Sequence, residues 1–203
     1  MLRHNPDKKL IAISFPGSTV RDLQYFVKNE HDLEIEIISP REFLKAHTVD
    51  DQCQYMNLVV HTNEMRLREE VSNKLDDLKL ERFTYVHSSV FLTNIQIGDG
   101  VFMYPMSMSY PDAVIEDDVV VHGWVGISHK CVFKKGAFIS GRCSISGGVV
   151  IGRYSWIGQC VTFYDNINIP DFTTIGAMSV ITKDITEPGT WTTVYNKKLV
   201  KLS

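Results

Sequence analysis

Two histidines and a pair of glycines are the residues of this chain best suited to do chemistry. His129 stands in the segment ISHKCVF, and Gly147 and Gly148 stand in SGGVVIG, eighteen residues further on. An imidazole titrates near neutral pH and can take a proton from an amine or a hydroxyl. A glycine lets a ligand approach its backbone closely, so its N–H can donate to a developing oxyanion. A second histidine, His122, precedes His129 by seven residues.

The elements that must position these residues repeat with a period of six. In steps of six from Phe91 to Ile181, fifteen of sixteen residues are apolar, Ser109 being the exception, and the residue four later is never charged or aromatic. Such a period is typical of a parallel β-helix, in which three hexads close a triangular coil of about 18 residues. A β-sandwich would instead show a period of two and turn signals every 8–12 residues. The pattern predicts about five coils with an unbroken register over 91–186.

Stacking of the coils brings the chemical residues together. Residues about 18 apart become neighbours at a strand spacing of about 4.8 Å. This predicts a column of His129, Gly147, Asp165 and Lys183, about 14 Å long. His129 holds neither the interior nor the small corner position of its hexad, so we expect it to face solvent beside a glycine-lined groove. The Gly147 N–H is the expected oxyanion donor.

Residues 1–86 lack this period and alternate between two patterns. The segments KKLIAISF, LEIEIIS and NLVVHT predict strands, and VRDLQYFVKNE and NEMRLREEVSNKLDDL predict helices. Their alternation favours a small α/β domain with a parallel sheet, Rossmann-like in outline. The turn SFPGSTV keeps a single glycine, Gly17, where a dinucleotide fingerprint has three. With Ser18 and Thr19 it forms either a simple strand-to-helix turn or a helix N-terminus that meets a phosphate.

Composition and charge argue against several classes of protein. The 203 residues carry a net charge of -3, which favours neither nucleic acid nor a membrane surface as a partner. No apolar run approaches the roughly 18 residues that cross a bilayer, and the polar start MLRHNPDKK does not resemble a signal peptide. The four cysteines show no metal-ligand spacing. We therefore expect a cytoplasmic protein with reduced thiols and no metal.

The two-part layout resembles a group of bacterial acyltransferases that contains sialic-acid O-acetyltransferases and bacillosamine N-acetyltransferases. The resemblance covers nearly the whole chain and is strongest from IGDG to SVITKDI; ISHKCVF matches the group's pattern around its general base at His129 and Cys131. It implies a left-handed β-helix that forms a homotrimer, with acyl-CoA in the groove between neighbouring helices. The implied segments are a Rossmann-like acceptor-binding domain (1–86), a left-handed β-helix acyltransferase domain (87–187) and a C-terminal cap or tail (188–203).

Two departures from that group concern the site. Lys130 replaces the acidic residue that follows the base, and a lysine cannot orient an imidazole as a carboxylate does. The glycine-rich turn that receives a nucleotide-sugar is reduced to Gly17. His122 stands where related enzymes have a polar residue near the acceptor, and it either contacts the acceptor or orients His129.

The resemblance implies an acyltransferase that uses acyl-CoA, most simply acetyl-CoA, to acylate the amine of a nucleotide-linked amino sugar in bacterial glycan synthesis. A hydroxyl of a sugar or sialic acid is the alternative acceptor, and a trimeric scaffold with a degraded site is the non-enzymatic alternative. The candidate catalytic residues are His129 and His122. The candidate acceptor-binding residues are Gly17, Ser18 and Thr19. The candidate cofactor-binding residues are Gly147, Gly148, Phe138, Asp165, Ala177, Lys183 and Lys197.

Overall fold

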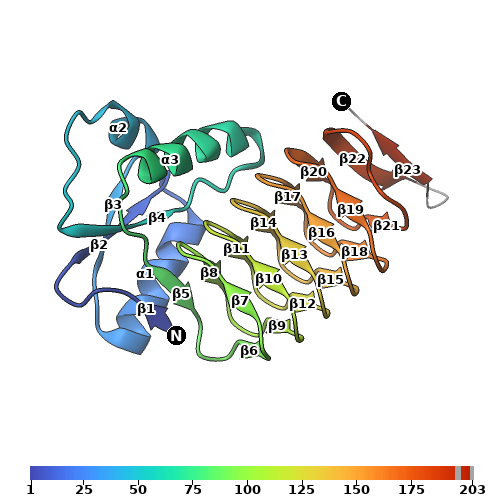
Figure 1. Ribbon diagram of the computed structural model, residues 1–203, viewed down its shortest axis with the longest axis horizontal. Coiled ribbons are helices and arrows are strands. Elements are labelled where there is room, and N and C mark those ends of the chain that lie inside the picture. The colour runs from blue at the N-terminus through green and yellow to red at the C-terminus, as the bar shows by residue number, and fades with distance from the viewer. Residues whose placement is uncertain (195–197, 202–203) are drawn as a thin grey trace.

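The computed structural model describes residues 1–194 and 198–201, and its larger part is a β-solenoid of short parallel strands (Figure 1). Three sheets form its sides. The first face contains β5 (Thr84–Val86), β8 (Phe102–Met103), β11 (Val120–Val121), β14 (Phe138–Ile139), β17 (Trp156–Ile157) and β20 (Thr173–Ile175). The second face contains β6 (Phe91–Leu92), β9 (Met108–Ser109), β12 (Gly126–Ile127), β15 (Ser144–Ile145), β18 (Thr162–Phe163) and β21 (Val180–Ile181). The third face contains β7 (Gln96–Ile97), β10 (Val114–Ile115), β13 (Val132–Phe133), β16 (Val150–Ile151) and β19 (Asn168–Ile169).

The chain visits the three faces in order and turns at a corner after each strand. We call the turns after first-face, second-face and third-face strands the first, second and third corners. The solenoid has about six turns, one more than predicted, and matches the predicted left-handed β-helix. The large residue of each hexad faces the interior, where Ile127, Ile145 and Phe163 pack in one continuous core.

The predicted register is wrong in the first turn. Phe91 is 59% exposed, and Leu92 instead pairs with Ser109 and packs against the core. The Val86–Met103 and Leu92–Ser109 pairs span one residue fewer than the pairs in later turns. This turn ends the stack, so no turn beneath it enforces the hexad spacing.

From Asn94 to Met178, every corner contains one residue in the left-handed region of φ. Trp124 (66°) holds this place at the first corner, and Lys130 (59°) and Gly148 (71°) hold it at the second. This conformation turns the chain sharply from one face to the next. It carries a steric cost for every residue type except glycine. Hydrogen bonds to the preceding turn hold these corners in place. One example joins the Gly148 N–H to the His129 carbonyl at 2.9 Å.

The N-terminal residues form a three-stranded parallel sheet in the order β3-β2-β4, with helices packed on it. The strands are β2 (Lys9–Ile13), β3 (Ile35–Ile38) and β4 (Cys53–Asn57), and the helices are α1 (Ser18–His31), α2 (Pro40–Lys45), a 3-10 turn (Thr62–Glu64) and α3 (Met65–Asp77). The two long helices and the strands β2 and β3 agree with the predictions, whereas the strand predicted at 57–62 (NLVVHT) lies earlier, at Cys53–Asn57, and overlaps the predicted range only at Asn57. The sequence pattern missed α2, which a capping box between Ser39 and Glu42 starts. A Rossmann-like fold implies more than this three-stranded sheet, so that part of the fold class stays a prediction.

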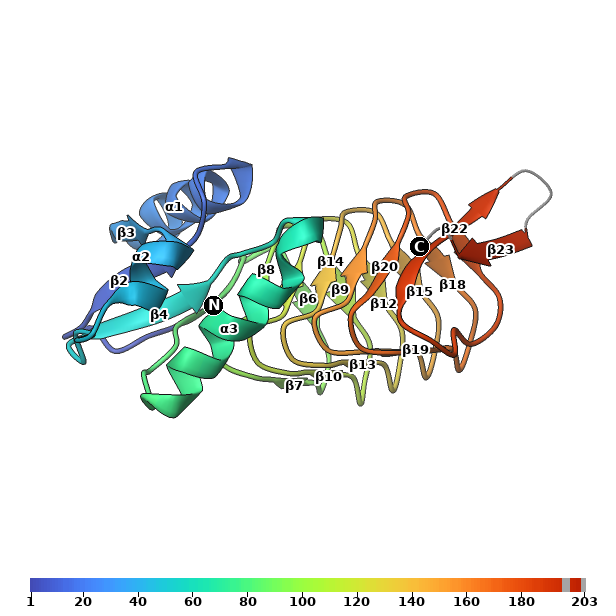
Figure 2. The ribbon, with the colours of Figure 1, turned by 90° about the horizontal axis from the view of Figure 1, so that it is seen from above.

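This α/β layer covers the first face of the solenoid (Figures 1 and 2). The outward side chains of Phe102, Val120 and Phe138 share one core with Val20 and Leu23 of α1. The contact therefore buries apolar side chains from both parts of the chain, the main source of stability in such an interface.

A buried arginine locks α3 to the third corner. Arg68 is 0% exposed and donates to the carbonyls of Asn57, Val59, Gly136 and Asp118. Loss of hydration lowers the pKa of its guanidinium to about 10. The position of the α/β layer is thus fixed by polar as well as apolar contacts.

Both ends of the solenoid are closed by added strands. β1 (Leu2–Arg3) pairs antiparallel with β5, so β5 joins the solenoid sheet although its residues fall within the predicted first domain. At the other end β22 (Gly189–Val194) continues the first face in parallel with β20, β23 (Lys198–Lys201) folds back on it, and Trp191 packs against the core. In the described part of the chain, no helix is both long and apolar enough to cross a bilayer.

Candidate active site

His129 lies exposed at the second corner, in the turn after β12. Its ring lies against Gly147 of the next turn. A Cβ added to Gly147 would lie 2.4 Å from His129 Cε1, closer than real contacts allow. The imidazole can therefore occupy this place only because residue 147 has no side chain.

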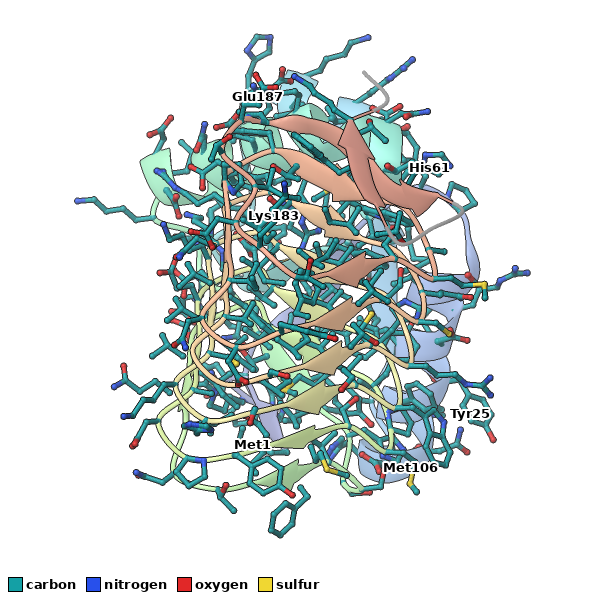
Figure 3. All side chains as sticks on the ribbon, turned by 90° about the vertical axis from the view of Figure 1, so that its right-hand side faces the viewer. Met1, Tyr25, His61, Met106, Lys183 and Glu187 are labelled. Atoms are coloured by element: carbon teal, nitrogen blue, oxygen red, sulfur yellow. The ribbon has the colours of Figure 1, made fainter. Side chains whose placement is uncertain are left out.

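The predicted column exists. Gly148 donates to the His129 carbonyl at 2.9 Å, and Asn166 donates to the Gly147 carbonyl at 2.8 Å. Asp165 and the exposed Lys183 follow at the same place in the next two turns. Figure 3 shows Lys183 across the solenoid from His61, which belongs to the α/β layer. The second corner is thus open along its length.

The expectation that the Gly147 N–H is a free oxyanion donor is not met. This N–H donates to Asp165 Oδ1 at 2.8 Å. The same contact recurs elsewhere in the solenoid, from Arg153 N–H to Asp171 at 2.7 Å. Asp165 therefore joins successive turns, and the N–H can reach a thioester oxygen only if this carboxylate moves.

In the part of the chain that the structure describes, the ring of His129 has one hydrogen-bonding partner. Its Nδ1 lies 3.3 Å from Ser128 Oγ. Within residues 1–194 and 198–201, no carboxylate forms an ion pair with His129, and no group of three or more metal-ligating side chains is placed to hold a metal. Lys130 is exposed, as a solvated cation would be.

His122 lies in a different environment, at the first corner beneath α1. Its ring stacks on Tyr104 at 4.0 Å and meets Phe138 edge-on at 5.3 Å. Its Nε2 is shielded from solvent and has no hydrogen-bond partner among the described residues. Burial lowers the pKa of His122 to about 4, so the ring is neutral at physiological pH. The whole of β12 separates it from His129, so the structure does not bring these two candidates together.

Two other candidates lie away from the second corner. Phe138 is 5% exposed on the covered first face, between His122 and Trp156, so the expectation that it contacts a cofactor is wrong. Ala177 is exposed but lies at the first corner. Lys197 lies outside the described residues.

A cavity of about 390 Å³ opens at the carboxyl end of the parallel sheet. Gly17, Ser18 and Thr19 line it at the start of α1, where no side chain caps the helix and no acidic residue stands in the first turn. The uncapped N–H groups and the positive end of the helix dipole therefore face the cavity.

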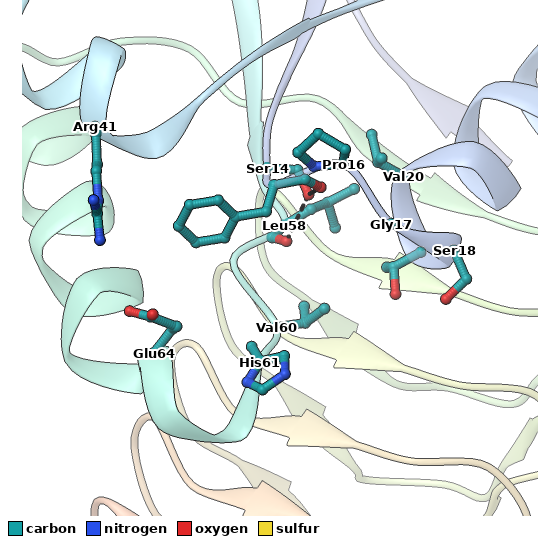
Figure 4. Close-up of a pocket in the computed structure, with 12 residues that line it drawn as sticks. Ser14, Pro16, Gly17, Ser18, Val20, Arg41, Leu58, Val60, His61 and Glu64 are labelled. Carbon is teal, nitrogen blue, oxygen red and sulfur yellow. Dashed lines mark hydrogen bonds between the residues drawn. The ribbon is translucent and has the colours of Figure 1, made fainter.

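Arg41, His61 and Glu64 complete the wall opposite Gly17 (Figure 4), and the sequence analysis did not select them. Arg41 follows β3 and His61 follows β4. In parallel α/β sheets ligands bind outside the carboxyl ends of the strands. The first polar residue after the strand predicted at 33–39 was the signal for Arg41, whereas His61 lay inside the strand predicted at 57–62.

Comparisons with known proteins place this geometry in context. No protein-family model matches the chain. A segment of 81 residues is 35% identical to a probable UDP-3-O-acylglucosamine N-acyltransferase of Arabidopsis thaliana, covering 40% of this chain and 27% of that protein. A segment of 104 residues is 33% identical to the UDP-3-O-acylglucosamine N-acyltransferase of Cupriavidus metallidurans, covering 51% and 28%. The match thus spans about a quarter of the length of these relatives.

Two solved structures resemble the whole chain. The acetyltransferase domain of PglB from Neisseria gonorrhoeae has a TM-score of 0.82 and 18% identity, covering 96% of this chain and all of that one, and it is also solved with acetyl coenzyme A. PerB from Caulobacter crescentus, in complex with CoA and GDP-perosamine, has a TM-score of 0.73 and 16% identity, covering 90% and 93%.

The fold and the repeat thus define the class: a two-part protein similar to the hexapeptide-repeat acyltransferases. Within that class, the predicted resemblance to the sialic-acid O-acetyltransferase and bacillosamine N-acetyltransferase group is confirmed at the level of the fold.

Proposed function

We propose that this protein transfers an acetyl group from acetyl-CoA to the amine of a nucleotide-linked amino sugar. The observation that carries the proposal is the exposed imidazole of His129, laid across the bare backbone of Gly147 at an open corner of the solenoid. The names of similar structures support it, because one contains acetyl coenzyme A and another contains CoA and GDP-perosamine.

His129 has the properties of a general base in this reaction. Its ring is solvent-exposed, so a substrate can reach it, and no side chain at residue 147 separates the ring from the backbone of the next turn. The base takes a proton from the acceptor amine while the nitrogen attacks the thioester carbonyl. Lys183 lies further along the same corner, where a cation suits the phosphates of CoA.

The cavity at Gly17 suits the phosphates of a nucleotide-sugar. It combines an uncapped helix N-terminus with the guanidinium of Arg41, and both attract anions. Its wall includes Val60, whose carbonyl accepts from Trp156 Nε1 of the first face at 3.1 Å. The cavity therefore lies on the first-face side of the chain, whereas His129 lies at the second corner.

This separation favours a site shared between copies. The second face and the two corners beside it expose large apolar residues: Met108 of β9 is 43% accessible, Trp124 at the first corner 62% and Tyr110 at the second corner 50%. Exposed apolar surface of this kind favours covering by a partner. In a homotrimer, a neighbouring copy would cover this face and bring its own cavity to His129. The same geometry would serve a sugar hydroxyl as the acceptor.

Two observations favour the non-enzymatic scaffold as a second candidate. Asp165 accepts the hydrogen bond of the Gly147 N–H, and Lys130 stands where a carboxylate is expected. A protein that only assembles or binds would tolerate both features.

Release of free thiol from acetyl-CoA tests the two candidates. Wild-type protein is assayed with nucleotide amino sugars, free amino sugars and sialic acids, beside His129→Ala and the control His47→Ala, which removes another exposed histidine. We expect turnover with a nucleotide amino sugar, a loss of at least about a hundredfold in His129→Ala, and no loss in the control. Acetyl-CoA binding without turnover on any acceptor would favour the scaffold.

A further inference from the structure

A general base needs a second group that orients it, and the chain lacks the acidic residue that the resemblance implies beside His129. Its place is taken by Lys130, whose backbone occupies the left-handed turn position (φ 59°). No carboxylate within the described ranges pairs with the ring. Among the described residues, the hydroxyl of Ser128 is the hydrogen-bonding partner of the ring, with Oγ 3.3 Å from Nδ1.

The ring itself lies over the backbone of Gly147. The position of an added Cβ is 2.4 Å from Cε1, 2.9 Å from Nε2 and 3.0 Å from Nδ1. Cε1 is therefore the ring atom nearest to Gly147, and the two nitrogens lie at nearly equal distances from the added Cβ. Because Nδ1 is the nitrogen beside Ser128, Nε2 is the nitrogen left for a substrate.

We infer that Ser128 is the positioning residue of His129: its hydroxyl accepts the Nδ1–H and keeps the Nε2 lone pair free. The inference rests on the proposed function and adds to it the tautomer of the base. A neutral imidazole carries one N–H, and the partner of one nitrogen decides which nitrogen is free. A hydroxyl orients the ring, but it carries no charge to stabilise the imidazolium as a carboxylate does.

The proton balance of the step follows from this arrangement. Nε2 of His129 takes a proton from the acceptor amine while the amine nitrogen forms a bond to the thioester carbonyl carbon. The C–S bond then breaks, and the proton on Nε2 passes to the leaving thiolate. Ser128 holds the Nδ1–H throughout and exchanges no proton.

The tautomer can be measured without an acceptor, by long-range ¹H–¹⁵N correlation of the imidazole rings at pH 8. We expect a protonated Nδ1 and a free Nε2 for His129 in wild-type protein and in Ser128→Thr. In Ser128→Ala the Nε2–H form should grow. Ser146→Ala, which removes the hydroxyl at the same place in the next turn, should leave the spectrum unchanged. A dominant Nε2–H form in the wild type would mean that Ser128 donates to Nδ1, and would overturn the inference.

Kinetics provide the second readout. Ser128→Ala should lower kcat about tenfold at unchanged KM, far less than the ~10⁴ lost when the orienting carboxylate of a catalytic triad is removed. Ser128→Thr should restore most of the rate, and Ser146→Ala should match the wild type. Full activity in Ser128→Ala with an unchanged tautomer would overturn the role of Ser128. Absence of wild-type turnover would instead remove the proposed function, and the tautomer measurement would still decide how Ser128 acts on His129.

Discussion

The first and second corners of one solenoid turn each carry a histidine, and the two side chains differ in their exposure to solvent. His122 packs beneath α1 between Tyr104 and Phe138 and is neutral, with its Nε2 buried. His129 lies at the other end of β12, exposed against Gly147. Both residues belong to turns of the same repeat, so the repeat does not distinguish them. The difference arises because the α/β layer covers the first face and leaves the second corner open.

The comparison teaches that exposure, rather than residue type, separates the two candidates. Loss of hydration makes a charged imidazole costly at His122, so that ring cannot cycle a proton near neutral pH. His129, in contrast, is exposed to solvent. The predictions below test first the covering layer and then the open corner.

Removal of Arg68 should have the largest effect. Arg68→Ala leaves four buried carbonyls without their donor and separates α3 from the third corner. We expect a loss of about 3–5 kcal/mol in the free energy of unfolding. Urea denaturation at fixed protein concentration measures this. Arg142→Ala, an exposed arginine on the solenoid, should change it by less than about 0.5 kcal/mol. Equal effects of the two variants would show that the buried arginine does not hold the layer in place.

Because the His122 ring is largely shielded from water, the free energy of unfolding should depend on pH. Its pKa is about 4 in the folded protein and about 6.5 when unfolded, so between these values the unfolded chain binds the extra proton. Stability should therefore fall as the pH falls from 6.5 to 4, by up to about 3 kcal/mol from this group. The free energy of unfolding of His122→Phe, measured at pH 7.5 and pH 4.5, should lack that part of the fall.

His47→Phe provides the matched control, because His47 is exposed. It should show the same pH dependence as the wild type. If His122→Phe also follows the wild type, His122 is hydrated in solution and the contrast between the corners disappears.

A methyl group at Gly147 should block the open corner. In Gly147→Ala the new Cβ would meet Cε1 of His129 at 2.4 Å and displace the ring. We expect kcat/KM for thiol release to fall at least about tenfold, equivalent to about 1.4 kcal/mol, with the melting temperature little changed. Gly141→Ala is the control at the same turn position of the first corner, where the added Cβ lies 3.2 Å from the Gly123 carbonyl. A similar loss in both variants would point to a general effect on the turns rather than to His129.

Removal of Asp165 should have the smallest effect and sharpens the role of Gly147. Asp165→Ala and Asp171→Ala each delete one contact between successive turns and should each cost about 1 kcal/mol of unfolding free energy. Only Asp165→Ala frees the Gly147 N–H, so only this variant should raise kcat, by a few-fold. An unchanged kcat would argue against Gly147 as the oxyanion donor, and weaker acetyl-CoA binding would indicate that Asp165 itself contacts the donor.

Much of this arrangement could be predicted from local pattern. The hexad period determined the solenoid and the column from His129 to Lys183, because a fixed repeat places residues about 18 apart on top of one another. It failed at Phe91, where the first turn is shorter. It also gave no warning that Asp165 would occupy the Gly147 N–H, since a side chain's choice of partner depends on the neighbouring turn.

The sequence by itself therefore determined the coil, the stacking and which residues share a corner. Only the tertiary structure decided which corner is covered, because that depends on where the α/β layer docks. Phe138 and His122 became part of an apolar interface through contacts with that layer, not through their own hexads. Arg41 and His61 came to face Gly17 because parallel strands end at one edge of a sheet, although each lies far from Gly17 in the chain. Periodicity fixes neighbours within a repeat, whereas long-range packing fixes which of its surfaces remain free to bind a substrate.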